Sequence, residues 1–523
     1  MIVFQKANVF LSAVLMATAL STPALATEKA GSGKMPLTDA ACESAGPKGC
    51  LALAADSMSG AARLDAIKSM SYESVGHTLL VEQSYRQDPF ITSYERAKVK
   101  IDLEGKKVRM ETQLTWPESD PGLAESQSVM VATAERCVRK VAGAAGAAQN
   151  APCSLSQIDA VRDLFGIGPL HLLATAGQAP DLHFAAPKML RSTPHTVLAF
   201  SWDRIPVRIL INRFNHLPDA VETDQQLQDF WYHWGDVHRR IYLDNWVTVR
   251  GIRYPTNLVE ERNGVPWKST QFLDLKLDVP LEPNLFEMDP KVAGLGAKSP
   301  GWERPFSAAK GSDLAPGITF FPGAWNATLV KQDDGTVVLE APISGTYVAG
   351  VLDEARKRYA GSPVKAVLST SDSWPHVGGV REAVASKLPV YILDLNQALL
   401  DQFVAAKHEI HPDLLAKTPQ KPAWRIVAGK TIVGGGPNRL ELYPLRGAST
   451  ERQYMVYFPE HRLLYASDTL AINDDGSLYD PELMREVMEA VQREGLQVDT
   501  VFAMHQAPMP WNDVVKLVQN AMR

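Results

Sequence analysis

The stretch LSTSDSWPHVGGVRE, residues 368–382, decides how the second half of this chain folds. It begins where the apolar run Val364–Leu368 ends, and that run predicts a buried strand. It leads into a helix that starts near His376, because apolar residues then recur at helical spacing on one face: Val377, Val380 and Val384. The polar segment of the stretch therefore lies between a strand and a helix.

Strands and helices alternate on both sides of this stretch. On its N-terminal side, a hairpin turns at Asp334-Gly335 and a helix is expected over 348–359. On its C-terminal side, the expected elements are a strand (389–393), a helix (396–406), two hairpin-like pairs (431–445 and 454–466), a helix (481–494) and a strand (498–504). This order is that of an α+β or an α/β layered unit over residues 316–523, with sheets inside and helices outside, and we expect the α+β class.

Residues 59–290 are dominated by alternating runs joined by short turns, which predicts an antiparallel β-rich domain. Examples are the runs 99–103 and 107–112, and the hairpin signal Asn263-Gly264. Residues 27–58 are rich in small side chains and are predicted to be an extension. The Gly- and Pro-rich segment 291–315 is predicted to be a linker.

Residues 1–26 predict a secretory signal peptide. One early cation, Lys6, precedes an apolar run, and Ala24-Leu25-Ala26 forms an A-x-A cleavage pattern. A signal peptide directs export and is then removed. The mature chain would therefore lie in the periplasm or outside the cell. No later segment is long and apolar enough to be expected to span a bilayer.

The four cysteines of an exported chain predict disulfides, because their number is even and the compartment is oxidising. Three connectivities are open, and loop entropy favours the local pairs Cys42–Cys50 and Cys137–Cys153. No cysteine has a histidine at the spacing of a zinc knuckle, which argues against cysteine as a metal ligand.

Composition excludes several classes of protein. The chain has 523 residues, of which 45% are hydrophobic and 21% are charged, as in a globular protein of several domains rather than a disordered tail. Its formal net charge of −6 gives no basis for binding nucleic acid. The oligomeric state has no signature in the sequence.

The meander from Tyr242 to Gly264, with the pattern Y-x-D-x-W…G-x-R-Y-P…R-N-G, resembles the half-barrel of lipoprotein-carrier-like periplasmic proteins. That resemblance implies an apolar concave face in the N-terminal domain. Such a face would take a lipid-like or bulky ligand.

Residues 318–510 resemble the metallo-β-lactamase fold, in its hydrolase branch. Val337–Glu340 resembles the family's strand that ends in an acidic residue, and residues 368–382 fall where the family has T-H-x-H-x-D-H-x-G-G. Asp468 looks like the family's bridging aspartate, and His505 looks like its last histidine ligand. The resemblance implies an αββα sandwich in which strand ends hold two zinc ions that activate a water.

The sequence departs from the family pattern at the residues that would bind the first of the two zinc ions. The histidines of H-x-H fall on Ser371 and Ser373, the aspartate falls on Pro375, and a further histidine falls near Ser449. A serine hydroxyl is a poor zinc ligand, and proline has no ligating group. The ligands left by this comparison are His376, Asp468 and His505, which predicts one zinc ion at most, with Asp372 as an additional candidate.

Two functions are open at this point. In the first, an exported hydrolase uses His376, Asp468 and His505 to hold an ion whose bound water attacks an ester, lactone or amide-type bond of a small-molecule or lipid-like substrate. Its candidate pocket residues are Ser371, Ser373, Trp374 and Trp511.

In the second, no metal is bound, and His376 caps its helix or donates to Asp468. The protein would then be a catalytically inactive relative that binds a lipid-like ligand or an envelope partner. A serine chemistry built from Ser371, Ser373 and Asp372 with His376 lacks the spacing of a nucleophile elbow.

An aromatic cluster at Phe230–Trp234 contains His233 and is followed by Asp236 and His238. Packing on a sheet face is its simplest interpretation. A metal site and a ligand-lining surface are the alternatives.

Overall fold

The computed structural model describes residues 39–81, 91–116, 124–142, 148–473 and 475–522. The predicted signal peptide and the first part of the predicted extension lie outside these residues. Within them, no helix is both long and apolar enough to cross a membrane.

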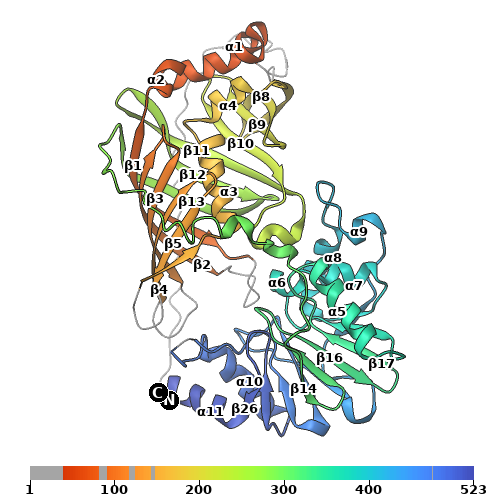
Figure 1. Ribbon diagram of the computed structural model, residues 1–523. Coiled ribbons are helices and arrows are strands. Elements are labelled where there is room, and N and C mark those ends of the chain that lie inside the picture. The colour runs from red at the N-terminus through yellow and green to blue at the C-terminus, as the bar shows by residue number, and fades with distance from the viewer. Residues whose placement is uncertain (1–38, 82–90, 117–123, 143–147, 474, 523) are drawn as a thin grey trace, which may run out of the picture. The chain divides into compact units, whose positions relative to one another are not determined.

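In the described part of the chain, a 13-stranded antiparallel sheet occupies the N-terminal half (Figure 1). Its order is β6-β5-β4-β3-β2-β1-β13-β12-β11-β10-β9-β8-β7. The strands are β1 (Ser69–Leu79), β2 (Thr92–Asp102), β3 (Lys107–Trp116), β4 (Ala124–Thr133), β5 (Cys137–Ala142), β6 (Ala148–Pro152), β7 (His183–Leu190), β8 (Thr193–Trp202), β9 (Ile205–Asn212), β10 (Pro218–Gln225), β11 (Val237–Val249), β12 (Ile252–Arg262) and β13 (Val265–Leu277). The expected antiparallel β-rich architecture is confirmed, and Asn263-Gly264 forms the turn between β12 and β13 with both residues at positive φ.

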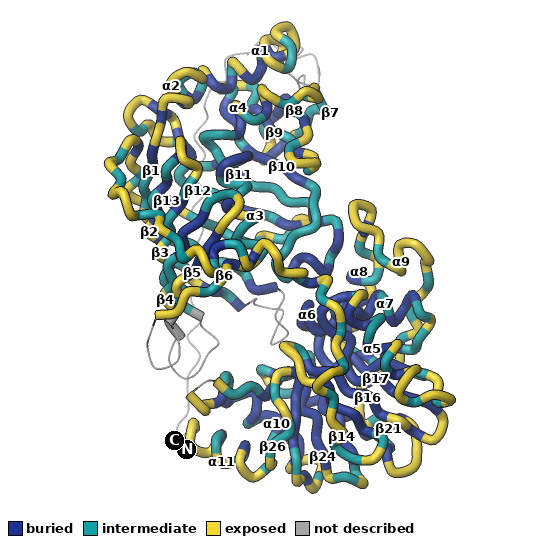
Figure 2. The backbone as a smooth tube through the Cα atoms, viewed as in Figure 1, coloured by how far each residue is buried: buried dark blue, intermediate teal, exposed yellow. Residues whose placement is uncertain are grey.

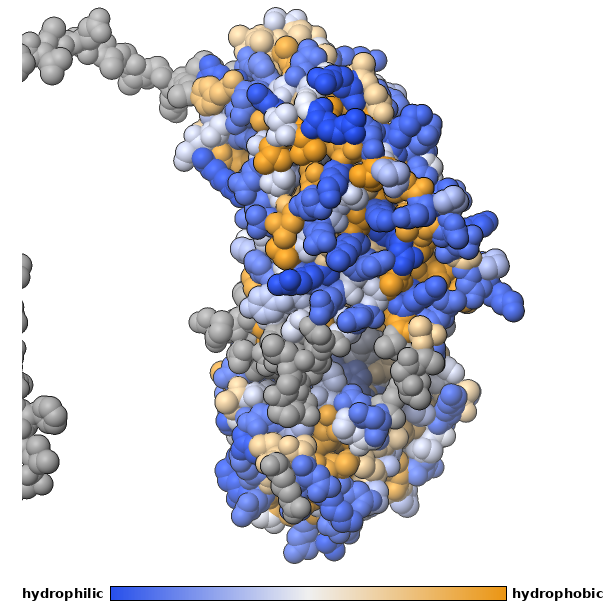
Figure 3. Space-filling model, turned by 90° about the vertical axis from the view of Figure 1, so that its left-hand side faces the viewer, coloured by the Kyte–Doolittle hydropathy of each residue, from blue (hydrophilic) through white to orange (hydrophobic). Residues whose placement is uncertain are grey.

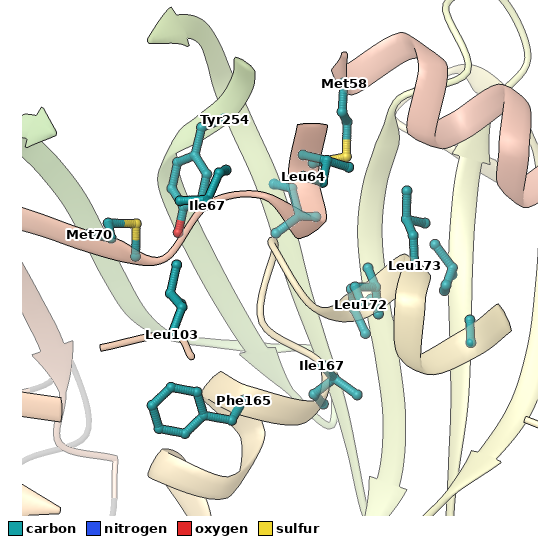
Figure 4. Close-up of a cluster of buried hydrophobic side chains, with 14 of the residues drawn as sticks. Met58, Leu64, Ile67, Met70, Leu103, Phe165, Ile167, Leu172, Leu173 and Tyr254 are labelled. Atoms are coloured by element: carbon teal, nitrogen blue, oxygen red, sulfur yellow. The ribbon is translucent and has the colours of Figure 1, made fainter. Parts of the chain in front are cut away.

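Helices fill one face of this sheet: α1 (Ala40–Met58), α2 (Ala61–Asp65), α3 (Leu155–Gly166) and α4 (Leu172–Gln178). Figure 4 shows Met58, Phe165 and Leu172, from three of these helices, in the same buried cluster as the strand residue Met70. Hydrophobic and hydrophilic residues are interspersed over the upper part of the face shown in Figure 3.

Residues 40–58 belong to this packed core and do not form a loose extension. They form α1, which buries Cys50, Ala54 and Met58 against the sheet. Because the side chains of this segment are small, apolar and polar residues do not recur at helical spacing. The sequence therefore did not indicate an amphipathic helix here.

Two further sheets form the C-terminal half, as far as its described residues show. The first has the order β14-β15-β16-β17-β18-β19-β20, and the second β21-β22-β23-β24-β25-β26. The strands are β14 (Ser312–Ala315), β15 (Ile318–Phe321), β16 (Ala327–Gln332), β17 (Gly335–Leu339), β18 (Val364–Leu368), β19 (Val390–Leu393), β20 (Trp424–Val427), β21 (Thr431–Val433), β22 (Leu440–Pro444), β23 (Tyr454–Phe458), β24 (Leu463–Tyr465), β25 (Thr500–Phe502) and β26 (Met509–Pro510).

These sheets share one buried core, to which the first contributes Val330 and Leu368 and the second Val456 and Phe502. Most of their strands are drawn dark blue, as buried, in the lower half of Figure 2. The longer helices are α5 (Gly345–Arg358), α7 (Val380–Ala385), α8 (Gln397–Ala405), α10 (Pro481–Arg493) and α11 (Trp511–Ala521). Helices α5, α7 and α8 bury apolar residues against the first sheet, and α10 and α11 against the second, so an α+β architecture with helices outside is confirmed.

Two predicted segments differ in detail. The helix expected from His376 onward is divided into α6 (Trp374–Val377) and α7, because Gly378 and Gly379 lie between them. The segment 291–315 contains the 3-10 turns η3 (Gly296–Lys298) and η4 (Gly301–Glu303) and ends in β14, and Trp302 within it is buried in the core beside α5.

Candidate metal centre

Three strand ends deliver the side chains of the candidate site. Residue His376 follows β18, Asp468 follows β24 and His505 follows β25. Strands β24 and β25 are parallel, with Tyr465 opposite Phe502, so their carboxyl ends lie together. The β18 end joins them through Thr370, whose hydroxyl lies 2.7 Å from that of Ser467.

The structure brings His376, Asp468 and His505 together. His376 Nε2 lies 3.3 Å from Asp468 Oδ2, and His505 Nε2 lies 3.1 Å from Asp468 Oδ1. One potential ligand atom from each residue lies within 4.8 Å of the others. His376 is 2% exposed, whereas about a third of the His505 side chain is open to solvent. The trio is therefore a buried cluster with one accessible side.

Backbone and side-chain hydrogen bonds orient two of the three residues. His505 Nδ1 donates to the carbonyl of Ala324 at 2.8 Å, which leaves the Nε2 lone pair of the neutral ring facing Asp468. The backbone N–H of Asp468 donates to Gln453 Oε1 at 3.0 Å. His376 Nδ1 is buried without a hydrogen-bond partner among the described residues.

The charge states follow from burial and mutual attraction. Burial lowers the pKa of His376 to about 4, against the opposing influence of Asp468, so this imidazole is neutral at neutral pH. Burial works against ionisation of Asp468, but His376 and His505 outweigh it and hold its pKa below the ordinary value. Burial also opposes a charge on His505, but its contacts with Asp468 outweigh this and raise its pKa.

These donors suit a divalent cation. Two imidazole nitrogens and one carboxylate oxygen are ligand types that zinc and iron(II) accept, and three protein ligands leave positions open. The hydrogen bond from His505 Nδ1 to a carbonyl is the outer contact that commonly orients a ligating histidine. The three residues therefore fit a single metal ion.

The residues that fall at the family's first zinc site offer no imidazole or carboxylate ligands. Ser371 Oγ accepts a hydrogen bond from the Ser373 backbone at 3.1 Å, and the Ser449 backbone donates to Glu486 at 3.1 Å. All three residues present hydroxyls, which are poor zinc ligands.

Three other predicted residues lie elsewhere. Asp372 is not part of the cluster, because its carboxylate accepts from Arg452 Nε at 2.8 Å. Trp374 does not line an open pocket, because it is 3% exposed and packs edge-on against Trp231. Trp511 begins α11 and packs against the core of the second sheet.

Sequence reasoning did not identify two residues beside the cluster. Ala324 supplies the carbonyl that orients His505, and the Trp325 ring lies 5.8 Å from that histidine ring. Both belong to the connection between β15 and β16. A backbone carbonyl has no signature in a sequence. The only signal that could have pointed to this segment is Trp325, a single tryptophan in a short connection.

A second group, Asp39, Cys42 and His216, also has closely spaced donors. It is not a metal centre, because Cys42 is bonded to Cys50. The other pair is Cys137–Cys153, and the Cα–Cα distances are 4.4 Å and 5.5 Å. These are the two local pairs that the spacing favoured.

No family model matches this chain, and no curated protein matches it. Among solved structures, it is similar to the inverting sec-alkylsulfatase Pisa1 from Pseudomonas sp., with 15% identity and a TM-score of 0.30 over 40% of each chain. It is also similar to a metallo-β-lactamase from Erythrobacter litoralis, with 18% identity and a TM-score of 0.30 over 40% of this chain and 95% of the other. A metallo-β-lactamase from Pontibacter korlensis gives 16% identity and a TM-score of 0.32, over 40% of this chain and 99% of the other.

The match therefore spans less than half of the alkylsulfatase. At such scores, similarity assigns no role to any residue of this chain. Its chemistry has to follow from its own side chains.

Proposed function

We propose that this chain is an exported metal-dependent hydrolase in which His376, Asp468 and His505 hold one zinc ion. The observation that supports this most directly is the orientation of His505. Its Nδ1 is already bound to a carbonyl, so in the neutral ring Nε2 presents a lone pair to an ionised carboxylate. Two electron-rich atoms 3.1 Å apart need a proton or a cation between them.

A bound zinc ion would lower the pKa of a water and polarise the bond to be cleaved, such as that of an ester, a lactone or an amide. The chain's own residues would provide the remaining functions. The Ala324 carbonyl fixes the ring of His505, and Gln453 fixes the backbone of Asp468. The exposed side of His505, next to Trp325, is where a small-molecule substrate would approach.

Export is part of the same proposal. Two cysteine pairs at disulfide distance are compatible with an oxidising compartment, the periplasm or the exterior. The division into domains at 59–290, 291–315 and 316–523 stays a prediction, and α1 packs with the first of these domains.

The alternative function, binding of a lipid-like ligand by an inactive relative, gains less support. It relies on a free apolar face on the N-terminal sheet, and residues of α1, α3 and α4 occupy such a face in the described part. The half-barrel resemblance stays a prediction.

Metal analysis of single-residue variants tests the proposal. The mature protein, loaded with zinc and desalted, should lose one equivalent of zinc in His376→Ala and in His505→Ala, and His183→Ala, which changes an exposed histidine, should lose none. Hydrolysis of a panel of chromogenic esters, lactones and amides should fall about 100-fold or more in the first two variants. Equal zinc content in parent and His376→Ala, with both folded, would refute the proposed centre.

A further inference from the structure

Two loops meet at the accessible side of the His376 cluster. Residues 322–326 connect β15 to β16, and they include Ala324, whose carbonyl accepts the hydrogen bond from His505 Nδ1. Residues 503–508 follow β25 and carry His505 itself. The orientation of this imidazole therefore depends on how firmly the first loop is held to the second.

One side chain, that of Asn326, joins the two loops. It belongs to a residue that is 4% exposed. Its Nδ2 donates to the carbonyl of Ala503 at 2.9 Å and to that of Gln506 at 3.4 Å, and its Oδ1 accepts from the backbone N–H of Gly323 at 2.9 Å. The backbone N–H of Asn326 donates to the carbonyl of Met504 at 2.8 Å. The amide is therefore engaged at both ends, with one loop at its oxygen and the other at its nitrogen.

The same contacts extend to the loop that carries the third residue of the cluster. The backbone N–H of Met504 donates to the carbonyl of Ser467 at 2.9 Å, and Ser467 immediately precedes Asp468. Met504 is thus bound to this loop through its N–H and to Asn326 through its carbonyl. The segment that carries His505 is held from two sides.

The hydrogen bonds of Asn326 require a carboxamide. The side chain accepts one hydrogen bond through its C=O and donates to two carbonyls through its NH₂ group. An aspartate of the same shape would place carboxylate oxygen against the carbonyls of Ala503 and Gln506. An alanine would remove the donor from both carbonyls and the acceptor from the N–H of Gly323, which is costly for buried groups.

We propose that Asn326 is a positioning residue of the metal centre, which holds His505 in the orientation that presents Nε2 to the ion. It acts through the Ala324 carbonyl and the main chain of the second loop, and it supplies no ligand itself. The proposal rests on the function proposed above, because it assumes that this centre binds zinc. Loss of the amide would free the ring of His505 to rotate, so the affinity for zinc would fall while the fold persists.

Zinc affinity of the full mature chain, measured by competition with a chelator, tests the proposal. We expect Asn326→Ala and Asn326→Asp to weaken binding about 10-fold or more. Asn438→Ala is the matched control, because Asn438 is also buried and its Nδ2 donates to two carbonyls, of Pro316 and Lys331, at the other end of β16. It should lower stability in urea to a similar extent and leave the affinity unchanged. An equal loss of affinity in Asn438→Ala, or no loss in the folded Asn326 variants, would overturn the proposal.

A second measurement reports on the ring and needs no metal. In the nuclear magnetic resonance spectrum of zinc-free protein with isotope-labelled histidine, the signals missing from His505→Gln belong to His505. Its Nδ1–H should be visible in the parent and in Asn438→Ala, because a carbonyl protects this proton from exchange with water. The signal should be lost in Asn326→Ala and weakened in Asn326→Ser, which keeps one hydroxyl donor and serves if the alanine variant does not fold.

The two measurements separate this proposal from the function on which it rests. If the parent binds no zinc, the proposed function fails, and the Nδ1–H signal still decides whether Asn326 positions His505. If the parent binds zinc and this signal is unchanged in the Asn326 variants, only the positioning role is refuted.

Discussion

Glu340 is a carboxyl group with no exposed surface, directly after β17. Its side chain accepts hydrogen bonds from the backbone and the hydroxyl of Thr370. Burial raises its pKa to about 8, although these bonds oppose the shift. The group is therefore protonated in the folded protein over much of the physiological pH range.

We predict that Glu340→Gln reduces the dependence of stability on pH. The folded pKa of about 8 lies above the unfolded value of 4.5, so the folded state binds more protons between these limits. The free energy of unfolding should then fall as pH rises through this window, by up to about 1.4 kcal/mol per pH unit. Glutamine keeps a donor and an acceptor and does not titrate. Urea unfolding at pH 5, 6, 7 and 8 measures the difference, and Glu287→Gln, on an exposed residue, should behave as the parent. A constant difference between Glu340→Gln and parent at all four pH values would contradict this.

The candidate site was predictable from the sequence only where side chains follow strand ends. His376, Asp468 and His505 come together as the pattern of strands implies. Asp372 does not, because Arg452, some 80 residues away in the chain, holds its carboxylate. The role of Ala324 could not be predicted, because it depends on a main-chain oxygen.

At the scale of elements, η2 (Phe230–Trp234) supports the short helix that contains His376. Trp374, two residues before this histidine, packs edge-on against Trp231 at 4.8 Å and Trp234 at 5.2 Å. The sequence predicted that the aromatic cluster packs on a sheet face. Its partner could not be predicted, because more than a hundred residues separate the two segments in the chain.

We predict that Trp374→Ala weakens zinc binding at the His376 centre. Loss of the ring leaves a void beside α6, which should cost about 3–5 kcal/mol of stability and loosen the helix. Zinc affinity of the folded variant, measured by competition with a chelator, should fall about 10-fold or more. Trp511→Ala removes the same type of side chain at a site that packs against the core of the second sheet, and it should leave this affinity unchanged. Equal affinities in the two variants would show that η2 does not position His376.

At the scale of the whole molecule, sequence periodicity predicted the sheets well and the segments between them poorly. The hairpins of the N-terminal sheet and the strands from β16 to β25 follow from alternating or continuous apolar runs. Residues 40–58 and Trp302 enter cores without such a pattern. Their burial depends on contacts that are distant in sequence, which no local pattern records.

We predict that the two disulfides contribute unequally to stability. Cys137–Cys153 closes 16 residues and Cys42–Cys50 closes 8. Chain entropy assigns about 3 kcal/mol to the first and about 2.5 kcal/mol to the second. Urea unfolding of the paired serine variants, Cys137→Ser/Cys153→Ser and Cys42→Ser/Cys50→Ser, should rank them in this order. The opposite order would show that native-state packing of α1 outweighs loop closure.

The contact between η2 and α6 sets a limit on how this chain can be cut. An expression boundary placed after the glycine- and proline-rich segment, at Gly317, would remove Trp231, Trp234 and Trp302 together. The truncated product would expose Trp374 and the apolar surface around α5, and it would be prone to aggregation. A fragment intended to retain the His376 cluster should therefore start upstream of Leu227, and a shuffled or fused version of the C-terminal half would have to include that segment.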